Sequence, residues 1–298
     1  MKRIIRQILR KLGVQIIKIK NTFPNHIENG AELSPITINY LLSKNGTVMF
    51  VDINKGRGLP INSYGSKGNH PFSFAASIAK NLSNEKQYNK IFEILSVYYK
   101  YVAPLNAGII AGVSKKSVLH NYPAWAIVMP WDTKNMEEWK EHIVKSVIME
   151  NSREKSKAGI EKGWTWIGPV DNVKLSIEAK RLTNLLQSIQ KDGYMRNDEN
   201  DGDIVANLLV NEQNEWVWQS IGAQHRASVL SALDLKNIPI RVHKVIRRQD
   251  VEFWPNVLNK MFTVNEALNV FDMIFNASFS HITSNWDNYI SEQKANDE

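Results

Sequence analysis

The sequence predicts an α+β protein that ends in a short helical tail, and three observations support this fold class. Apolar residues recur at helical spacing in five segments, at residues 72–82, 88–102, 136–151, 177–192 and 264–275. Shorter apolar runs bounded by turn residues predict strands at residues 204–210, 216–220 and 238–246. Apolar residues make up 43% of the 298 residues, which is enough for one large domain or two modest ones.

The first half of the chain gives weaker patterns. Residues 36–42 and 47–53 flank Asn45-Gly46 and predict a β-hairpin, because Asn-Gly suits a tight turn that needs positive φ. A glycine-rich loop follows at residues 56–68, and residues 103–134 show no regular period. Residues 164–170 predict a further short strand.

A charged segment at residues 152–163 has the composition of a link between domains. We therefore expect four regions: a basic amphipathic helix at 1–22, an N-terminal α+β region at 23–160, a core domain at 161–250 and a C-terminal helical tail at 251–298.

Composition excludes several classes of site. The chain has no cysteine, so disulfides, thiolate metal sites and cysteine nucleophiles are excluded. No apolar run reaches the length of about 18 residues that a spanning helix needs. The N-terminus lacks the apolar block and small-residue cleavage site of a secretory signal. These features predict a cytoplasmic protein.

The basic character of the chain belongs to its N-terminal segment. Residues 1–20 hold seven Lys and Arg and no acid, while the rest of the chain has 37 − 7 = 30 Lys plus Arg against 30 Asp plus Glu. Residues 2–12 alternate apolar and basic faces at helical spacing. Such a helix either lies on an anionic membrane surface, which makes the protein peripheral at the inner face, or packs on the protein's own core.

The segment with the clearest chemistry is the turn at residues 220–226, Ser-Ile-Gly-Ala-Gln-His-Arg. Here a predicted strand meets a predicted helix through small residues, which let backbone N–H groups approach a phosphate closely. The N-terminus of a helix adds free N–H donors and the positive end of its dipole. His225 and Arg226 add side-chain donors, and Arg grips phosphate with two parallel hydrogen bonds. An ordinary helix start with a surface His-Arg pair gives the same pattern.

This turn resembles two related signatures: the Gly-Gly-Cys-His-Arg of sulfiredoxins, which follows a strand, and the Asp-Gly-His-His-Arg type motif of ParB-like domains. Residues 233–242 resemble the strand after the motif helix, where Ile-Pro recurs. Residues 167–170 resemble the Ile-Arg-Pro entry, and residues 181–189 resemble the preceding helix, which ends in a Ser-Ile pair. Residues 164–248 thus look like a ParB/sulfiredoxin-like core, closest in character to the small-molecule kinases of that superfamily.

The resemblance implies a fold that binds ATP or ADP, with Mg²⁺. The positions that match nucleotide-contacting residues lie on the first helix and on the turn, and are Arg181, Asn184, Ser188, Gly222, Ala223, Gln224, His225 and Arg226. Two departures matter. Gln224 stands where sulfiredoxins have their cysteine, so sulfiredoxin chemistry is excluded. Gly168 stands at the Arg of Ile-Arg-Pro, so one phosphate contact is missing or comes from elsewhere.

Two activities of the superfamily remain. Residues 161–250 carry 12 Lys plus Arg against 12 Asp plus Glu, which disfavours nucleic acid as a partner because phosphate-backbone binding needs a cationic surface. We therefore expect a kinase that acts on a small hydroxylated acceptor, with surface-polysaccharide metabolism as a candidate setting. The alternative is a nucleotide-gated binding module for DNA or protein, without kinase activity.

Phosphoryl transfer needs a carboxylate that accepts the proton of the acceptor. The candidates are Glu178, one turn before Arg181, and Asp201 and Asp203, just before the strand at residues 204–210. Each is equally well explained as a solvated surface acid. No set of residues predicts a dedicated metal site. We expect the nucleotide turn to open into a cleft that residues before 160 help to line, among them the glycine-rich loop and residues 122–131.

Overall fold

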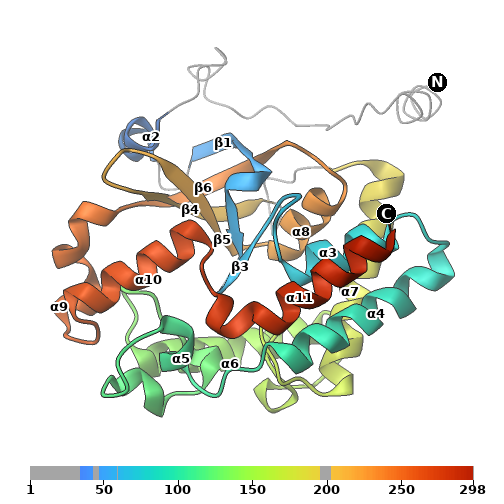
Figure 1. Ribbon diagram of the computed structural model, residues 1–298, viewed down its shortest axis with the longest axis horizontal. Helices are drawn as coiled ribbons and strands as arrows, with labels where there is room; N and C mark the ends of the chain where they lie inside the picture. Colours follow the sequence, from blue (N-terminus) through green and yellow to red (C-terminus); the bar gives the residue numbers. More distant parts are fainter. Residues whose placement is uncertain (1–33, 43–46, 59, 195–202, 298) are drawn as a thin grey trace.

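The computed structural model describes residues 34–42, 47–58, 60–194 and 203–297, and shows a mixed sheet with helices packed around it (Figure 1). This confirms the general α+β class. The strands are β1 (Thr47–Asp52), β2 (Gly56–Gly58), β3 (Asn62–Ser63), β4 (Ile204–Val210), β5 (Trp216–Gly222) and β6 (Asn237–Arg247). The predicted basic helix at residues 1–22 lies outside the described residues.

The sheet has the strand order β1-β6-β4-β5-β2-β3. β4 lies at its centre, parallel to β6 and antiparallel to β5. β1 pairs antiparallel with β6, and β2 pairs parallel with β5. Strands from residues 23–160 therefore flank strands from residues 161–250, and both segments contribute to the same sheet and the same buried core.

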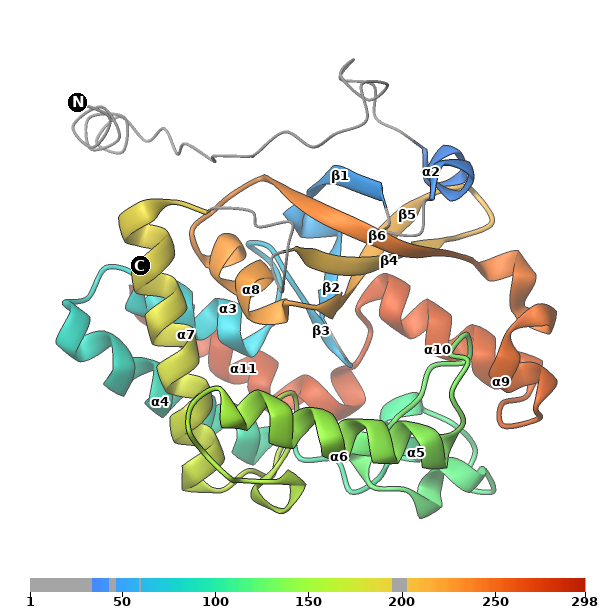
Figure 2. The same ribbon diagram turned by 180° about the vertical axis from the view of Figure 1, so that it is seen from behind.

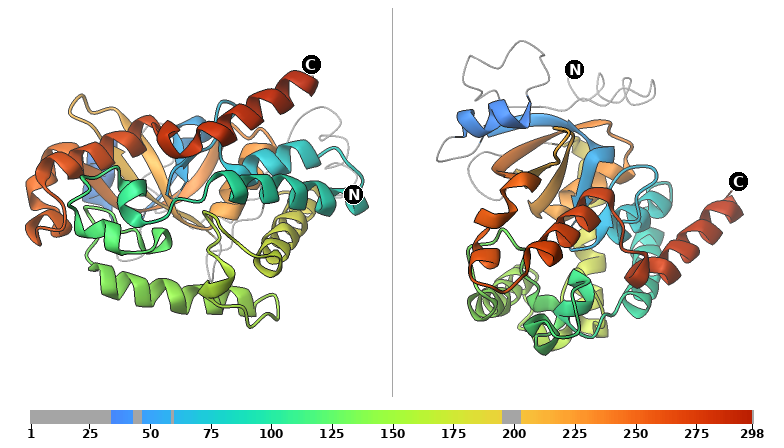
Figure 3. Two further views of the ribbon diagram at one scale, coloured as in Figure 1. Left: turned by 60° about the horizontal axis from the view of Figure 1, so that its bottom comes forward. Right: turned by 60° about the vertical axis from the view of Figure 1, so that its left-hand side comes forward.

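The helices are α2 (Pro35–Leu41), α3 (Pro71–Ala79), α4 (Asn84–Tyr101), α5 (Ala107–Ala111), α6 (Met136–Ser152), α7 (Asn172–Asp192), α8 (Gln224–Ala232), α9 (Pro255–Leu258), α10 (Val264–Asn276) and α11 (Ser280–Asp297). Short 3₁₀ turns lie at Ile53–Lys55, Val118–Asn121, Ala124–Ala126, Ile160–Lys162 and Arg248–Phe253. Seen from behind, α6 crosses the bottom of the molecule beside α5, and α7 rises next to α8 (Figure 2). α10 and α11 follow one another across the front of the sheet (Figure 3).

Local capping explains where the site helices begin. Asn135 and Glu138 form a capping box, in which each side chain accepts a hydrogen bond from the other residue's backbone N–H, and this starts α6. The Asp171 carboxylate accepts hydrogen bonds from the N–H groups of Val173 and Lys174 and starts α7. α7 therefore begins at Asn172, five residues before the predicted start at 177. None of the helices among the described residues is long and apolar enough to cross a membrane.

The structure corrects three expectations. Most of the predicted strand at residues 36–42 lies in helix α2, which ends at Leu41, because the Ser34 hydroxyl accepts from the Thr37 N–H and Pro35 favours the first helical position. Residues 164–170 form only an isolated bridge, since the hydroxyls of Tyr98 and Tyr99 on α4 bond two of their carbonyls. The C-terminal tail holds α9 and α11 as well as the predicted α10.

Candidate functional site

The turn between β5 and α8 has the shape of an anion-binding turn. β5 ends at Gly222, Ala223 adopts a left-handed conformation with φ 56°, and α8 begins at Gln224. A residue with a Cβ is strained in this region, and such strain is frequent where a backbone must approach a ligand. The first-turn N–H groups of a helix have no acceptor within the helix, and its dipole is positive at this end.

The turn opens into a cleft of ≈ 560 Å³, a size that suits a nucleotide. All eight positions predicted to contact nucleotide line it, and they are Arg181, Asn184, Ser188, Gly222, Ala223, Gln224, His225 and Arg226. α7 supplies the first three and the turn supplies the rest. The opposite wall is α6, so residues numbered below 160 do line the cleft. Neither the glycine-rich loop at residues 56–68 nor residues 122–131 line it, which makes those two parts of the expectation wrong.

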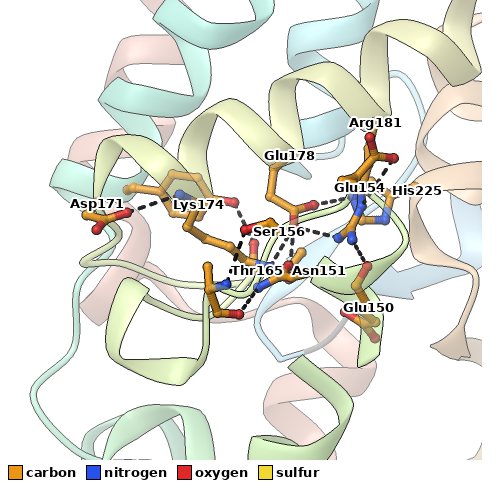
Figure 4. A network of polar contacts seen from close by, with 12 residues as sticks. Glu150, Asn151, Glu154, Ser156, Thr165, Asp171, Lys174, Glu178, Arg181 and His225 are labelled. Carbon is orange, nitrogen blue, oxygen red and sulfur yellow. Dashed lines mark hydrogen bonds and ion pairs between the residues drawn. The ribbon is translucent and has the colours of Figure 1, made fainter. Parts of the chain in front are cut away.

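Glu178 lies at the centre of a polar network behind the cleft (Figure 4). Its carboxylate is 2.7 Å from the Lys174 Nζ, and both side chains are completely buried. The same carboxylate is 2.9 Å from the Arg181 guanidinium and 2.7 Å from Nε2 of His225. Asn151 at the end of α6 accepts a hydrogen bond from Lys174 at 2.9 Å. The network thus joins α6, α7 and α8 at one point.

Glu178 is held in its charged form. Burial alone would raise the pKa of its carboxyl group, but the Lys174 ammonium, the hydrogen bond with His225 and the Arg181 guanidinium together lower the pKa well below its usual range. Because this carboxylate is buried and bonded to both groups, it holds the Arg181 guanidinium and the His225 imidazole in fixed orientations. Glu178 is therefore a positioning residue, which orients Arg181 and His225 at the wall of the cleft.

The two predicted catalytic acids that the structure describes, Glu178 and Asp203, do not line the cleft. Glu178 lies behind the wall of the cleft rather than in it, because its oxygens are taken up by the buried network. Asp203 pairs with Arg241, whose Nε donates to it at 2.8 Å, and it does not line the cleft. Asp201 lies outside the described residues. The structure thus corrects the assignment of Glu178 and Asp203 as direct proton acceptors.

Gly168 lies where the backbone leaves no room for a side chain. A Cβ at this position would lie 1.9 Å from the backbone oxygen of Tyr99. No side chain fits there while α4 keeps its place. Within the cleft, Arg153 at the end of α6 adds a cation to those of Arg181 and Arg226.

The α6 wall was missed by sequence reasoning. It contributes Trp139, His142, Ser146, Glu150 and Arg153 to the cleft. These positions are three or four residues apart, so they form one stripe along the helix. The spacing of these residues could have predicted a shared helix face. The stripe mixes aromatic, polar and charged residues, however, and has no apolar period. Glu150 and Glu154 also line the cleft, and they are the acids of its described lining that could hold a divalent cation.

His70 takes no part in the cleft. It precedes α3, is 1% exposed, stacks on Tyr64 with ring centroids 4.6 Å apart, and bonds the Ser228 hydroxyl through Nδ1 at 3.1 Å. His70 is the N-cap residue of α3, but its side chain makes no cap hydrogen bond.

We expect His70 to make the fold sensitive to mild acid. Burial, and next the nearby His225, lower the pKa of His70 to about 3, whereas an unfolded histidine titrates near about 6.5. The unfolded chain then binds more protons below pH ~6.5, so stability falls as pH drops from there towards 3. Between pH 6.5 and 5 this amounts to about 2 kcal/mol, at about 1.4 kcal/mol per pH unit. Urea unfolding at both pH values measures it.

The variant His70→Asn should lack this part of the pH dependence. His281→Gln is the matched control, because His281 is exposed on α11. Equal pH dependence in the wild type and in His70→Asn would contradict the prediction.

Comparisons with family models, with curated proteins and with solved structures found no match to this chain. The functional interpretation below therefore depends on the geometry of the cleft and on the sequence motifs that line it.

Proposed function

We propose that the chain is a kinase, which binds ATP or ADP with Mg²⁺ in the cleft between α6, α7 and α8 and transfers a phosphoryl group to a small hydroxylated molecule. One observation carries the proposal. The eight positions that resemble nucleotide contacts in ParB/sulfiredoxin-like proteins come from separate helices and line a single cleft. In this proposal residues 161–250 correspond to the nucleotide-binding core of that superfamily.

The cleft has the parts that phosphate binding needs. The N-terminus of α8 supplies backbone donors, and Arg226 supplies a guanidinium from the first turn. Arg181 donates to Glu178 and to the Glu150 carbonyl, which fixes it at the wall. Mg²⁺ would neutralise phosphate charge, and Glu150 and Glu154 are the carboxylates of the described cleft that would hold it.

A nucleotide-gated binding module is the second candidate. It is favoured by one observation, that neither Glu178 nor Asp203 lines the cleft. The wall that α6 adds to the cleft favours the kinase instead, because phosphoryl transfer must exclude water from the reacting group. Transfer of labelled phosphate from ATP or ADP to a hydroxylated acceptor separates the two candidates.

We expect Arg226→Ala to weaken nucleotide binding by about 1.5–3 kcal/mol, the usual range for hydrogen bonds to a charged group. This corresponds to a roughly 10- to 150-fold higher Kd. Isothermal titration of ATP and ADP in the presence of Mg²⁺ measures it.

The matched control is Arg247→Ala. Arg247 is 41% exposed, pairs with Asp250 at the end of β6 and lies outside the cleft. Unchanged affinity in folded Arg226→Ala would mean that the turn has only a structural role. If the wild type binds neither nucleotide, the proposed function is refuted.

A further inference from the structure

A second, smaller cavity of ≈ 240 Å³ lies beside the cleft, between the sheet and residues 127–134. Trp139, Trp164 and Ile221 line both spaces. Gln219, at the floor of the small cavity, is on β5 three residues before Gly222 of the phosphate-binding turn. The cavity therefore adjoins the end of the cleft where the phosphates are proposed to bind, and the two spaces share these three residues.

Three neighbouring strands project polar side chains into this cavity. Gln219 on β5 pairs in register with Asn207 on β4, and Asn207 pairs with Lys244 on β6. Residues in register point to the same face of a sheet, so the three side chains form a row. Such a row is unusual at the centre of a sheet, where apolar residues are expected.

Three polar atoms of this row are buried without a hydrogen-bond partner in the part of the chain that the structure describes. Gln219 is completely buried, and neither atom of its amide has a hydrogen-bond partner among the described residues. The same holds for Oδ1 of Asn207, which is 4% exposed, and for the indole N–H groups of Trp131 and Trp139. Trp131, Trp139, Asn207 and Gln219 all line the cavity. Proteins rarely leave buried polar groups unpaired, and a cluster of five such atoms around one cavity points to a ligand.

We propose that this cavity binds a neutral, polyhydroxylated molecule of about the size of a monosaccharide, and that this molecule is the phosphoryl acceptor. Only its role as acceptor rests on the proposed function. The unpaired atoms are three donors and two acceptors, and all belong to neutral groups. A hydroxyl both donates and accepts, so two adjacent hydroxyls satisfy the amide N–H and C=O of Gln219 together. The volume equals that of about eight water molecules at roughly 30 Å³ each.

Asp132 supplies a carboxylate for the proton-accepting role that Glu178 and Asp203 are not placed to fill. It lines the cavity, and its Oδ2 accepts a hydrogen bond from the Met129 N–H at 2.9 Å. Burial raises the pKa of its carboxyl group, which makes it a stronger base. In the proposed step the acceptor hydroxyl oxygen bonds to the terminal phosphorus of the nucleotide and its proton passes to Asp132. The bond from phosphorus to the leaving nucleotide oxygen breaks, and that oxygen keeps the electron pair.

Thermal unfolding of the full chain with D-glucose, D-ribose, myo-inositol or glycerol tests the site. At least one of these should raise Tm with the logarithm of its concentration above Kd, because a ligand that binds only the native state stabilises it by RT ln(1 + [L]/Kd). Gln219→Leu should lower the affinity for that ligand by about ten-fold or more, and Trp139→Phe should lower it too. The ligand-free Tm of Gln219→Leu should not fall, because the lost amide had no partner.

Gln213→Leu, the same change in the exposed β4–β5 turn, should bind like the wild type. No response to any of the four probes, or equal binding by the wild type and Gln219→Leu, overturns the site. Polyol binding in a protein that binds neither ATP nor ADP leaves the site standing and refutes the kinase. Asp132→Asn should keep the polyol-dependent rise in Tm and lose phosphoryl transfer, and transfer at the wild-type rate overturns the role of Asp132.

Discussion

Replacing Glu178 by Gln is expected to destabilise the fold by about 3–5 kcal/mol, because it leaves a buried charge without its partner. Lys174 is completely buried and lies 2.7 Å from the Glu178 carboxylate. The neutral amide cannot offset the Lys174 ammonium, and it also releases Arg181 and His225 from their fixed positions. Chemical denaturation gives the loss in the free energy of unfolding, and nucleotide titration of the folded fraction should show weaker binding.

Glu154→Gln is the matched control for this prediction. Glu154 lies 4.0 Å from the same Arg181, but its side chain is 22% exposed. We expect a change within about 1 kcal/mol, as for partly solvated pairs. Lys174→Met combined with Glu178→Gln should cost less than the sum of the two single changes, because the pair is removed together. An additive double variant would mean that the two charges are not coupled.

Gly168→Ala is expected to cost about 3 kcal/mol or more, at the upper end of the range for overpacked sites. The new Cβ would meet the Tyr99 backbone oxygen at 1.9 Å, and a backbone atom inside a packed helix cannot move aside as a side chain can. Gly168→Arg should be at least as damaging, because its side chain is larger and meets the same backbone oxygen. Thermal and urea unfolding measure both variants.

Gly222→Ala provides the comparison for stability. A Cβ at Gly222 would find its nearest neighbour, the Val205 Cβ, at 3.4 Å, an ordinary contact. We expect the free energy of unfolding to change by less than about 1 kcal/mol. If Gly168→Ala and Gly222→Ala are equally stable, the close approach of residue 168 to α4 does not constrain the fold.

The elements that sequence predicted well are those with a long, uninterrupted period. The predicted helix at residues 136–151 corresponds to α6, and the predicted strand at 204–210 has the bounds of β4. The strand prediction for residues 36–42 was wrong because the helix there has only two turns. Its helical period is too short to be recognised beside an Asn-Gly pair that predicts a hairpin. The strand prediction for residues 164–170 was wrong because two of their carbonyls accept hydrogen bonds from tyrosine hydroxyls of α4. That helix is distant in sequence, so its hydroxyls could not be foreseen there.

The same limit applies to the site. Sequence motifs identified the α7 and α8 residues that line the cleft, because these residues lie within short, recognisable segments. The role of Glu178 depended on Lys174 one turn earlier and on His225 from another helix, and only the fold brings those charges together. Gln219 lies in β5. The residue pattern of this strand does not show that the Gln219 amide faces a cavity instead of a hydrogen-bond partner.

The strand order has a consequence for how the chain is made. Thr47 of β1 pairs with Val242 of β6, and β2 pairs with β5, so the outer strands leave the ribosome long before the inner ones. The sheet cannot assemble until β6 has been synthesised, and until then the edge of β1 has no strand to pair with. Folding is therefore expected to be largely post-translational and slow, as pairings between distant parts of a chain generally are. Nascent chains that stop before β6 would expose these edges to one another, so the cell's chaperones have more to protect here than in a sheet built from successive hairpins.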